Sequence, residues 1–450
     1  MRKILLLIFV LALILGLCRC CTATYNQKAT TWALPLAKLT STPPSDTATQ
    51  MWVCFSGGGT RAMAMGYYVV DAFQRIKYSD STTLRDEIDY ASGVSGGSFV
   101  AAALGVYGAK EWVDFYKTGV YRNIQKDLVL RLFNPVNWLW LLSPYYTRTD
   151  LAAEFYSQYI FKDRVFGQLA TRPRVYINTT LLAEGAHVVF TPDYFSYIKS
   201  DLSLYPVGFA CAASSAFPGG FAPLTLRNYN DSVYTPEALM KDKKYRAAKL
   251  NADNNVSAYD FCRMYEFLHD RDNQWLHVSD GGIAGNSGVE RVLDEFNTGG
   301  AVLRAINNTQ VPLHRLIFVV VNAGTAKPDK SCTKRDIPDI PKVLLYTTGI
   351  AIDVVSGQRM TQLQDQVNAT WQMIQGSDNP AWKQMEKPYV IELNTRNIKT
   401  PALAEKFNAL PTSFDLPTES LYIIQQVVQE LLDNNAEYQR LLTSLKHADN

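Results

Sequence analysis

Two glycine-rich turns constrain the fold of this chain more than any other feature. The first covers residues 56–61 (SGGGTR) and the second covers 93–97 (GVSGG). Each follows a short apolar run typical of a buried strand, at 51–55 and 88–91, and each precedes a run typical of a helix. Repeated strand-turn-helix units predict an α/β protein with a mainly parallel sheet, whose functional groups lie beyond the carboxyl ends of the strands.

The second turn has the form of a nucleophile elbow. In the pattern G-x-S-x-G the central residue, here Ser95, occupies a sharp bend between a strand and a helix. The flanking glycines allow the backbone to bend, so that the hydroxyl group projects above the sheet. The pattern alone occurs by chance, but its position between a strand and a helix of small residues favours Ser95 as a nucleophile.

The first turn provides backbone donors. The N–H groups of Gly57, Gly58 and Gly59 lie at the start of a helix predicted over 60–78, where they can stabilise an oxyanion. Arg61 adds positive charge at a position where a cation opposes the helix dipole. A nucleophile beside an oxyanion hole indicates acyl transfer, above all ester hydrolysis. The turn lacks the Gly-Lys-Ser/Thr of a P-loop and the last glycine of a dinucleotide-binding loop.

A serine nucleophile needs a general base, and Asp280 is the best candidate. It follows a strand predicted over 275–279 and precedes Gly281 and Gly282, which allow close approach of backbone or substrate. Burial would raise the pKa of this carboxyl group toward that of a base. Two alternatives stay open: Asp280 caps the following helix, or a histidine such as His277 is the base of a histidine-dependent esterase.

Several further elements follow from the pattern. Strands are predicted at 173–180, 187–191, 316–322 and 389–393, and helices at 95–107, 207–217 and 418–445. Two segments interrupt the alternation. Segment 134–146 is rich in Trp, Leu and Tyr, and suits either a bilayer interface or a buried amphipathic helix. Segment 228–272 is polar and is interpreted as an insertion or a lid-like loop.

The N-terminus has the features of a secretory targeting segment. Two basic residues precede an apolar run over 4–17, which is too short to span a membrane comfortably. Cys18 follows at once, so either a lipoprotein lipidated on Cys18 or ordinary cleavage after Ala23 is expected. The prediction is a signal peptide over 1–21, a tether over 22–49, and export as a membrane-anchored lipoprotein of the cell envelope or as a secreted protein.

Net charge and cysteine spacing bear on two classes of partner, nucleic acids and metal ions. The net charge of +2 gives no indication of a nucleic-acid partner. The four cysteines that follow the N-terminal segment show no metal-ligand spacing, so no metal site is expected; they are Cys54, Cys211, Cys262 and Cys332.

The motifs together resemble the patatin-like phospholipase family. Four landmarks match it in order: the loop 57–61, the elbow 93–97, the run 213–219 (ASSAFPG) and the DGG sequence 280–282. They lie within residues 50–295, and looser similarity extends to the C-terminus, so that 50–450 is expected to form one acyl hydrolase domain with a helical C-terminal extension. The sequence SGGGTRAM is also similar to the cytosolic phospholipase A family, which has an arginine at the position of Arg61.

The resemblance implies a three-layer α/β/α sandwich, no cofactor, and a Ser-Asp dyad without histidine. Ser95 would attack an acyl carbonyl, Asp280 would accept its proton, and the N–H groups of residues 57–59 would hold the oxyanion. The implied substrate is a phospholipid or lysophospholipid, met at a membrane surface. A catalytically silent envelope protein that binds acyl chains is the alternative from another class.

Overall fold

The computed structural model describes residues 26–30, 48–231, 235–308, 311–325, 340–380 and 382–448. The apolar run over 4–17, Cys18 and most of the tether lie outside these residues, so the expectations about export and lipidation stay predictions. Within the described ranges, none of the helices is long and apolar enough to cross a membrane.

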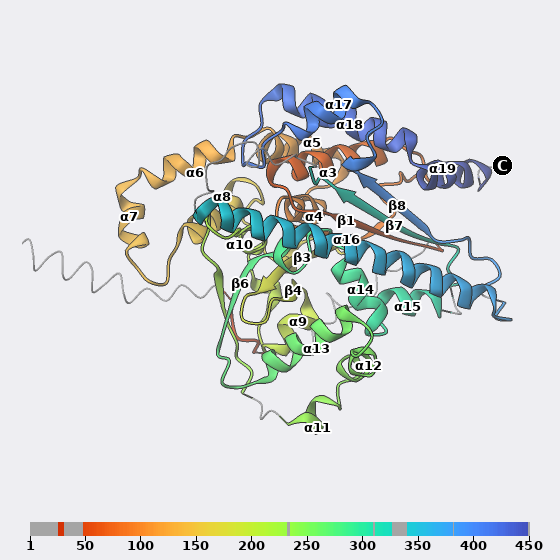
Figure 1. Ribbon diagram of the computed structural model, residues 1–450, viewed down its shortest axis with the longest axis horizontal. Helices are drawn as coiled ribbons and strands as arrows, with labels where there is room; N and C mark the ends of the chain where they lie inside the picture. The colour runs from red at the N-terminus through yellow and green to blue at the C-terminus, as the bar shows by residue number, and fades with distance from the viewer. Residues whose placement is uncertain are drawn as a thin grey trace, which may run out of the picture.

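A central eight-stranded sheet organises the chain, with the strand order β5-β6-β3-β2-β1-β7-β8 and β4 paired to β3 (Figure 1). The strands are β1 (Thr49–Phe55), β2 (Ile88–Val94), β3 (Arg174–Leu181), β4 (Ala186–Phe190), β5 (Leu224–Arg227), β6 (Trp275–Asp280), β7 (Arg315–Asn322) and β8 (Tyr389–Asn394). The pairs from β3 through β2, β1 and β7 to β8 are parallel, whereas β4, β5 and β6 join in antiparallel fashion. The sheet is therefore mixed, and the expected parallel arrangement holds on one side of β3.

Helices cover both faces of the sheet, so the expected three-layer α/β/α sandwich is confirmed (Figure 1). One layer contains α3 (Gly59–Phe73), α4 (Gly96–Val106), α10 (Val207–Ser214) and α18 (Thr418–Asn434). The other contains α13 (Val256–His269), α14 (Glu290–Asn297) and α16 (Ile340–Gln375). The remaining α-helices are α5 (Trp112–Phe115), α6 (Ile124–Leu132), α7 (Pro135–Leu141), α8 (Arg148–Tyr159), α9 (Pro192–Tyr197), α11 (Pro236–Leu239), α12 (Lys243–Asn251), α15 (Ala301–Ile306), α17 (Pro401–Asn408) and α19 (Ala436–Ala448).

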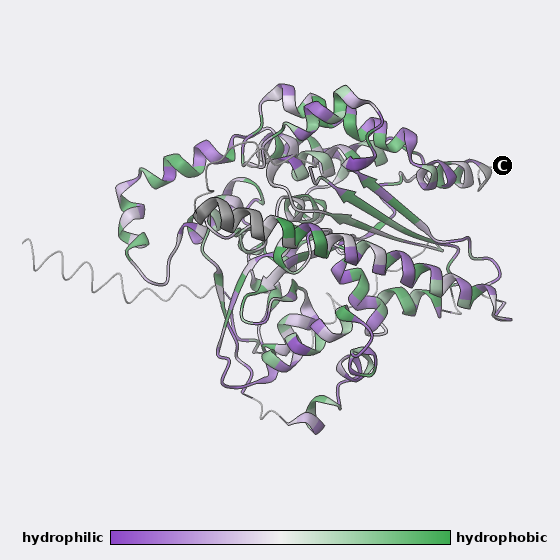
Figure 2. Cartoon of the chain, viewed as in Figure 1, coloured by the Kyte–Doolittle hydropathy of each residue, from purple (hydrophilic) through white to green (hydrophobic). Residues whose placement is uncertain are grey.

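The central strands are buried on both faces, which explains their nearly continuous apolar sequences. Every residue of β1 is buried, and seven of the eight residues of β7 are buried. Figure 2 shows these strands as the most uniformly hydrophobic part of the sheet. In the core, Trp52 of β1 stacks on Tyr90 of β2 with 3.9 Å between ring centroids. This rigid centre supports the two glycine turns that follow β1 and β2.

Two predicted helices differ from the structure. The helix predicted over 60–78 ends at Phe73, because the chain turns there and Lys77 forms a β-bridge with Thr83. The helix predicted over 418–445 is divided into α18 and α19 at Asn435, whose side chain accepts a hydrogen bond from the Tyr438 N–H at 2.9 Å. An asparagine in extended conformation ends one helix and caps the next.

Two interrupting segments also differ from their interpretations. Segment 228–272 is interpreted from its sequence as an insertion or a lid-like loop. It contains α11, α12 and α13, so it is largely helical and not a loop, while its interpretation as an insertion stays a prediction. Asn255 caps α13, and Phe261 of this helix packs against Tyr194 of α9. Segment 134–146 contains α7, in which no side chain is buried, so the buried amphipathic helix is wrong as well.

The contact between α3 and α19 generates a prediction for stability. Phe73 is fully buried and packs on Tyr438 with 6.1 Å between ring centroids, whereas Phe133 is 70% exposed. Phe73→Ala should lower the free energy of unfolding by about 3–5 kcal/mol, because it removes buried apolar area and leaves a cavity. Phe133→Ala, the matched control, should change it by less than about 0.5 kcal/mol. Urea denaturation of both variants tests this; equal effects would contradict the described packing.

Candidate active site

Strand register brings Ser95 and Asp280 to the same level of the sheet. Val94, the last residue of β2, pairs with Asn178 of β3, so Ser95 is level with Thr179. On the other side of β3, Asp280 pairs directly with Thr179. The two residues thus lie two strand spacings apart, roughly 10 Å between backbones, on either side of one strand. Their side chains approach each other, since the Ser95 hydroxyl group lies close enough to the Asp280 carboxylate to lower the pKa of that carboxyl group.

Ser95 adopts a backbone conformation that L-residues rarely adopt, with φ 49° and ψ −121°. The chain reverses sharply here between β2 and α4, and neighbouring backbone packs closely around the bend. A Cβ atom at Gly93 would lie 2.4 Å from the Gly97 carbonyl oxygen, and one at Gly97 would lie 2.5 Å from the Phe55 carbonyl oxygen. Glycine is therefore required at both positions, which accounts physically for the sequence pattern around Ser95.

The two glycine turns are packed directly against each other. A Cβ atom at Gly96 would lie only 1.9 Å from the carbonyl oxygen of Gly59. Gly58 and Gly59 both have positive φ angles, 142° and 62°, which turn the loop into the start of α3. The start of α3 and the start of α4 are therefore held side by side, and the N-terminal ends of both helices face the same space.

The three predicted oxyanion donors are not equivalent. The Gly57 N–H donates to the carbonyl oxygen of Asn286 at 3.0 Å, so this group is already paired. The expectation that residues 57–59 hold an oxyanion stays a prediction. The N–H groups of Gly58 and Gly59 make no hydrogen bond to the described part of the chain. Thr60, the next residue, donates to the Ser413 carbonyl oxygen at 2.9 Å. Two adjacent N–H groups are thus available beside Ser95.

Arg61 lies behind the loop, buried in the first turn of α3. Its Nε and Nη1 atoms donate to the carbonyl oxygens of Ala323 and Leu410, both at 3.1 Å. Its Nη2 atom lies 3.6 Å from the position that a Cβ atom would occupy on Gly58. Burial lowers the pKa of Arg61 to about 10, so the guanidinium group stays charged at neutral pH. Arg61 therefore both supports the loop and adds positive charge beside Gly58.

Asp280 is buried at the end of β6, where only 7% of its surface is exposed. Burial raises the pKa of its carboxyl group from the ordinary value of 3.8 to about 6, because the charged form loses solvation. A hydrogen bond from the Gly282 N–H, at 2.8 Å, and the nearby Ser95 hydroxyl group partly oppose this rise. The expected capping interaction is therefore present, and the same carboxylate also contacts Ser95.

A second layer of polar groups orients the elbow. The Ser95 N–H donates to Ser214 Oγ at 2.9 Å, and Ser214 Oγ donates to the Asn178 carbonyl oxygen at 2.6 Å. The Asn178 side chain in turn donates to Ser92 Oγ and to the Gly93 carbonyl oxygen at 2.9 and 2.8 Å. Ser214 belongs to the ASSAFPG run, whereas nothing in the sequence around Asn178 marks it as part of the site.

The histidines with described side chains lie elsewhere. His277 is exposed on β6, and its Nδ1 atom lies 3.0 Å from Thr225 Oγ1. Since side chains alternate along a strand, His277 and Asp280 point to opposite faces of the sheet. His187 is buried and its Nε2 atom lies 2.8 Å from Asn178 Oδ1, so that it contacts the second layer of the site. Within the described structure, no hydrogen bond joins a histidine to Ser95.

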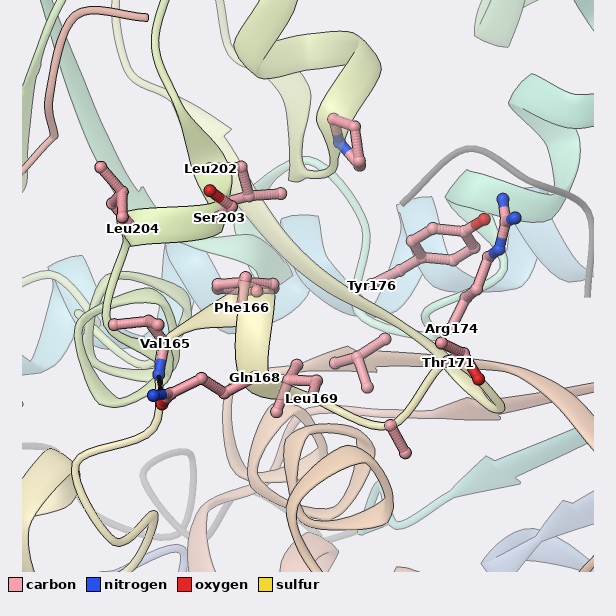
Figure 3. A pocket seen from close by; sticks show the side chains of 14 residues that line it. Val165, Phe166, Gln168, Leu169, Thr171, Arg174, Tyr176, Leu202, Ser203 and Leu204 are labelled. Atoms are coloured by element: carbon pink, nitrogen blue, oxygen red, sulfur yellow. Dashed lines mark hydrogen bonds between the residues drawn. The ribbon is translucent and has the colours of Figure 1, made fainter. Parts of the chain in front are cut away.

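A cavity of about 560 Å³ opens at the other end of β3 (Figure 3). Phe166, Leu169, Leu202 and Leu204 form its apolar part, and Arg174, the first residue of β3, lies at its polar end beside Tyr176. Neither Ser95 nor Asp280 lines this cavity. No cluster of metal-ligating side chains occurs among the residues that the structure describes.

The structure is therefore that of a layered α/β/α protein. Ser95 in the second glycine turn lies close to Asp280 at the end of β6, and the first glycine turn packs against the second. A model of the patatin-like phospholipase family matches residues 53–293, which is more than half of the 450-residue chain. The chain therefore belongs to the patatin-like phospholipase family. No curated protein sequence matches it.

Solved structures of human GIVD cytosolic phospholipase A2 are similar to this chain. One has 12% identity and a TM-score of 0.46, covering 93% of this chain and 65% of the human chain. A second, in complex with methyl gamma-linolenyl fluorophosphonate inhibitor and terbium chloride, has 13% identity and a TM-score of 0.37, covering 92% and 62%. The chain thus spans less than two thirds of the length of these neighbours.

The contact between Gly96 and Gly59 generates a prediction. Gly96→Ala would force the two turns apart, and a displacement of about 1 Å at a catalytic site typically lowers turnover about 100-fold. Hydrolysis of a soluble short-chain ester measures this, with Gly108→Ala as the control because no atom lies within 4 Å of a Cβ atom there. Full turnover by Gly96→Ala at unchanged thermal stability would contradict the need for this packing.

Proposed function

We propose that this protein is a serine-dependent lipid acyl hydrolase of the phospholipase A or lysophospholipase type. The observation that carries the proposal is the placement of the strained Ser95 level with and close to the buried Asp280, beside the unpaired N–H groups of Gly58 and Gly59. Membership of the patatin-like phospholipase family supports fatty acyl esters of lipids as the substrate class. Hydrolysis of such esters by this chain needs no metal or organic cofactor.

In the first half of the reaction, Ser95 Oγ attacks the acyl carbonyl carbon while its proton passes to Asp280. The carbonyl oxygen becomes an oxyanion, which the N–H groups of Gly58 and Gly59 and the positive end of α3 stabilise. The ester C–O bond then breaks. The leaving alcohol takes the proton from Asp280, and the acyl group stays on Ser95 as an ester.

In the second half, Asp280 removes a proton from a water molecule, which attacks the acyl-serine carbonyl carbon. The N–H groups of Gly58 and Gly59 stabilise the tetrahedral intermediate as before. The intermediate then collapses and releases the free fatty acid. Ser95 Oγ recovers its proton from Asp280, so both residues return to their starting states. A carboxylate with its pKa raised to about 6 is a stronger base than an exposed aspartate, which makes a dyad without histidine workable.

Export belongs to the same proposal. A targeting segment over 1–21, followed by cleavage or by lipidation on Cys18, would place the enzyme at the cell envelope or outside the cell. Its substrates would then be met at a membrane surface, where acyl chains are presented as an aggregate.

Three variants test the roles of the side chains. With mixed phospholipid and lysophospholipid vesicles, Ser95→Ala should reduce fatty-acid release to the background rate, because the nucleophile is lost. Asp280→Asn should reduce it about 100- to 10,000-fold, the range for loss of a general base. His277→Ala is the matched control and should keep the wild-type rate, since this side chain points to the other face of the sheet.

Two outcomes would contradict the dyad. Loss of release in His277→Ala with near-normal release in Asp280→Asn would favour a histidine-dependent esterase. Normal lipid binding by the wild-type protein without any release would favour a silent acyl-chain binding protein.

The raised pKa of Asp280 generates a prediction for pH dependence. The reaction needs the carboxylate form, and protonation begins to remove it as the pH falls toward about 6. kcat/KM for a soluble ester should therefore be constant above neutral pH, fall to half near pH 6, and fall about tenfold per unit below that. A profile that stays flat down to pH 4.5, with the protein folded by circular dichroism, would contradict a buried aspartate base.

A further inference from the structure

A large set of apolar side chains is exposed on α6, on α7 and on the loop after α7. We call residues 129–145 the α6–α7 projection; Figure 1 shows these helices extending from the layered body. Its exposed large apolar side chains are Val129, Leu130, Phe133, Val136, Trp138, Leu139, Trp140, Leu142 and Tyr145. So many exposed large apolar side chains within one short segment are unusual on a protein that meets only water.

Several polar groups of the projection are paired within it. Asn134 Oδ1 accepts a hydrogen bond from the Val136 N–H at 3.0 Å, and Asn137 Nδ2 donates to the Arg131 carbonyl oxygen at 2.7 Å. The indole N–H of Trp138 donates to the Leu132 carbonyl oxygen. Because these groups are already paired, they can enter a medium of low polarity at less cost than unpaired groups.

The base of the projection is connected to the catalytic loop through one short segment. The Ser413 carbonyl oxygen accepts a hydrogen bond from the Thr60 N–H, directly after the oxyanion loop, at 2.9 Å. The neighbouring Phe414 carbonyl oxygen accepts one from the Gln125 N–H in the first turn of α6, at 3.3 Å. The projection therefore begins on the side of the molecule that carries the catalytic loop.

An aromatic cluster links the same segment to the Asp280 turn. The Phe414 ring packs against Phe217 and Phe221, with 6.5 and 5.7 Å between centroids. Phe217 directly follows Ala216, whose carbonyl oxygen accepts the Asp280 N–H at 3.1 Å. The side chains of Phe217, Phe221 and Phe414 thus lie between the Asp280 turn and the start of α6.

The charged residues near the projection indicate which kind of apolar partner it can bind. Residues 122–148 contain four basic residues and one acidic residue, a net charge of +3. The acidic residue, Asp127, is paired with Arg122 at 2.6 Å. Lys126 and Arg148 are exposed at the two ends of the region. Trp, Tyr and Leu side chains flanked by basic residues match the interface of a bilayer that contains anionic lipids.

We propose that the α6–α7 projection docks into the interface of an anionic lipid bilayer and holds the catalytic loop at the membrane surface. The inference rests on the proposed function only for the choice of a lipid surface as the partner. Its experiments therefore measure binding in a Ser95→Ala background, where turnover is absent, and measure catalysis separately on a soluble ester.

The first experiment is co-sedimentation of the full chain with vesicles of phosphatidylcholine and phosphatidylglycerol. Trp138→Ser combined with Trp140→Ser should weaken the partition coefficient about tenfold or more, because two interfacial anchors are lost. Phe133→Ser combined with Leu142→Ser should do the same without removing a hydrogen bond of α7. Leu250→Ser combined with Tyr422→Ser is the matched control, since these side chains are 78% and 61% exposed on α12 and α18.

The second experiment separates docking by the projection from binding by any other segment. Brominated lipids should quench tryptophan fluorescence of the protein, and Trp138→Phe combined with Trp140→Phe should remove most of that quenching. With Ser95 restored, all projection variants should hydrolyse a soluble ester at the wild-type rate, so a failure of catalysis is distinguished from a failure of docking.

Three results would overturn the inference. The first is unchanged vesicle binding in both projection variants, and the second is an equal loss of binding in the Leu250/Tyr422 control. The third is a wild-type protein that does not bind vesicles and forms a dimer in sedimentation velocity, where the projection variants are monomers. The last result would mean that a second copy of the chain covers the projection.

Discussion

Backbone contact between the two glycine turns is the constraint on which the site depends. At Gly96 the Cα atom approaches the Gly59 carbonyl oxygen so closely that a methyl group would overlap it. This contact aligns the starts of α3 and α4, so two free N–H groups lie beside the Ser95 hydroxyl group. Without side chains between them, the turns act as one rigid unit, and the strained conformation of Ser95 is maintained by its surroundings.

The second half of the site depends on β3, which pairs in parallel with β2 and in antiparallel fashion with β6. Ser95 is level with Thr179 through the parallel pairing of β2 with β3, and Asp280 pairs with Thr179 through the antiparallel pairing of β6 with β3. The two residues therefore lie at the same level of the sheet, although β6 and β2 run in opposite directions. The sequence-based reasoning expected Asp280 at the carboxyl edge of a parallel sheet. Asp280 does lie level with Ser95, although β6 runs antiparallel to β3 and so differs from the parallel direction behind that expectation.

Elements with strong local signals were predictable, and elements defined by long-range contact were not. β1, β2 and β7 are continuous apolar runs, so burial on both faces is visible in the sequence itself. The polar segment that contains α12 and α13 hides its helices, because its few apolar residues pack on elements distant in sequence, as Phe261 does on Tyr194. The break at Asn435 was missed because apolar spacing continues through it, while a side-chain cap redirects the backbone.

By itself the sequence determined the two glycine turns and the positions of Ser95 and Asp280 at the ends of two strands, because glycine patterns and strand ends are local properties of the chain. Tertiary structure decided which groups are free to act. Packing of Asn286 against the loop occupies the Gly57 N–H and leaves those of Gly58 and Gly59. Burial gives Asp280 its raised pKa, and the absence of any covering element within the described chain leaves α7 exposed. Desolvation and hydrogen-bond competition depend on neighbours far away in sequence, so only the folded chain specifies them.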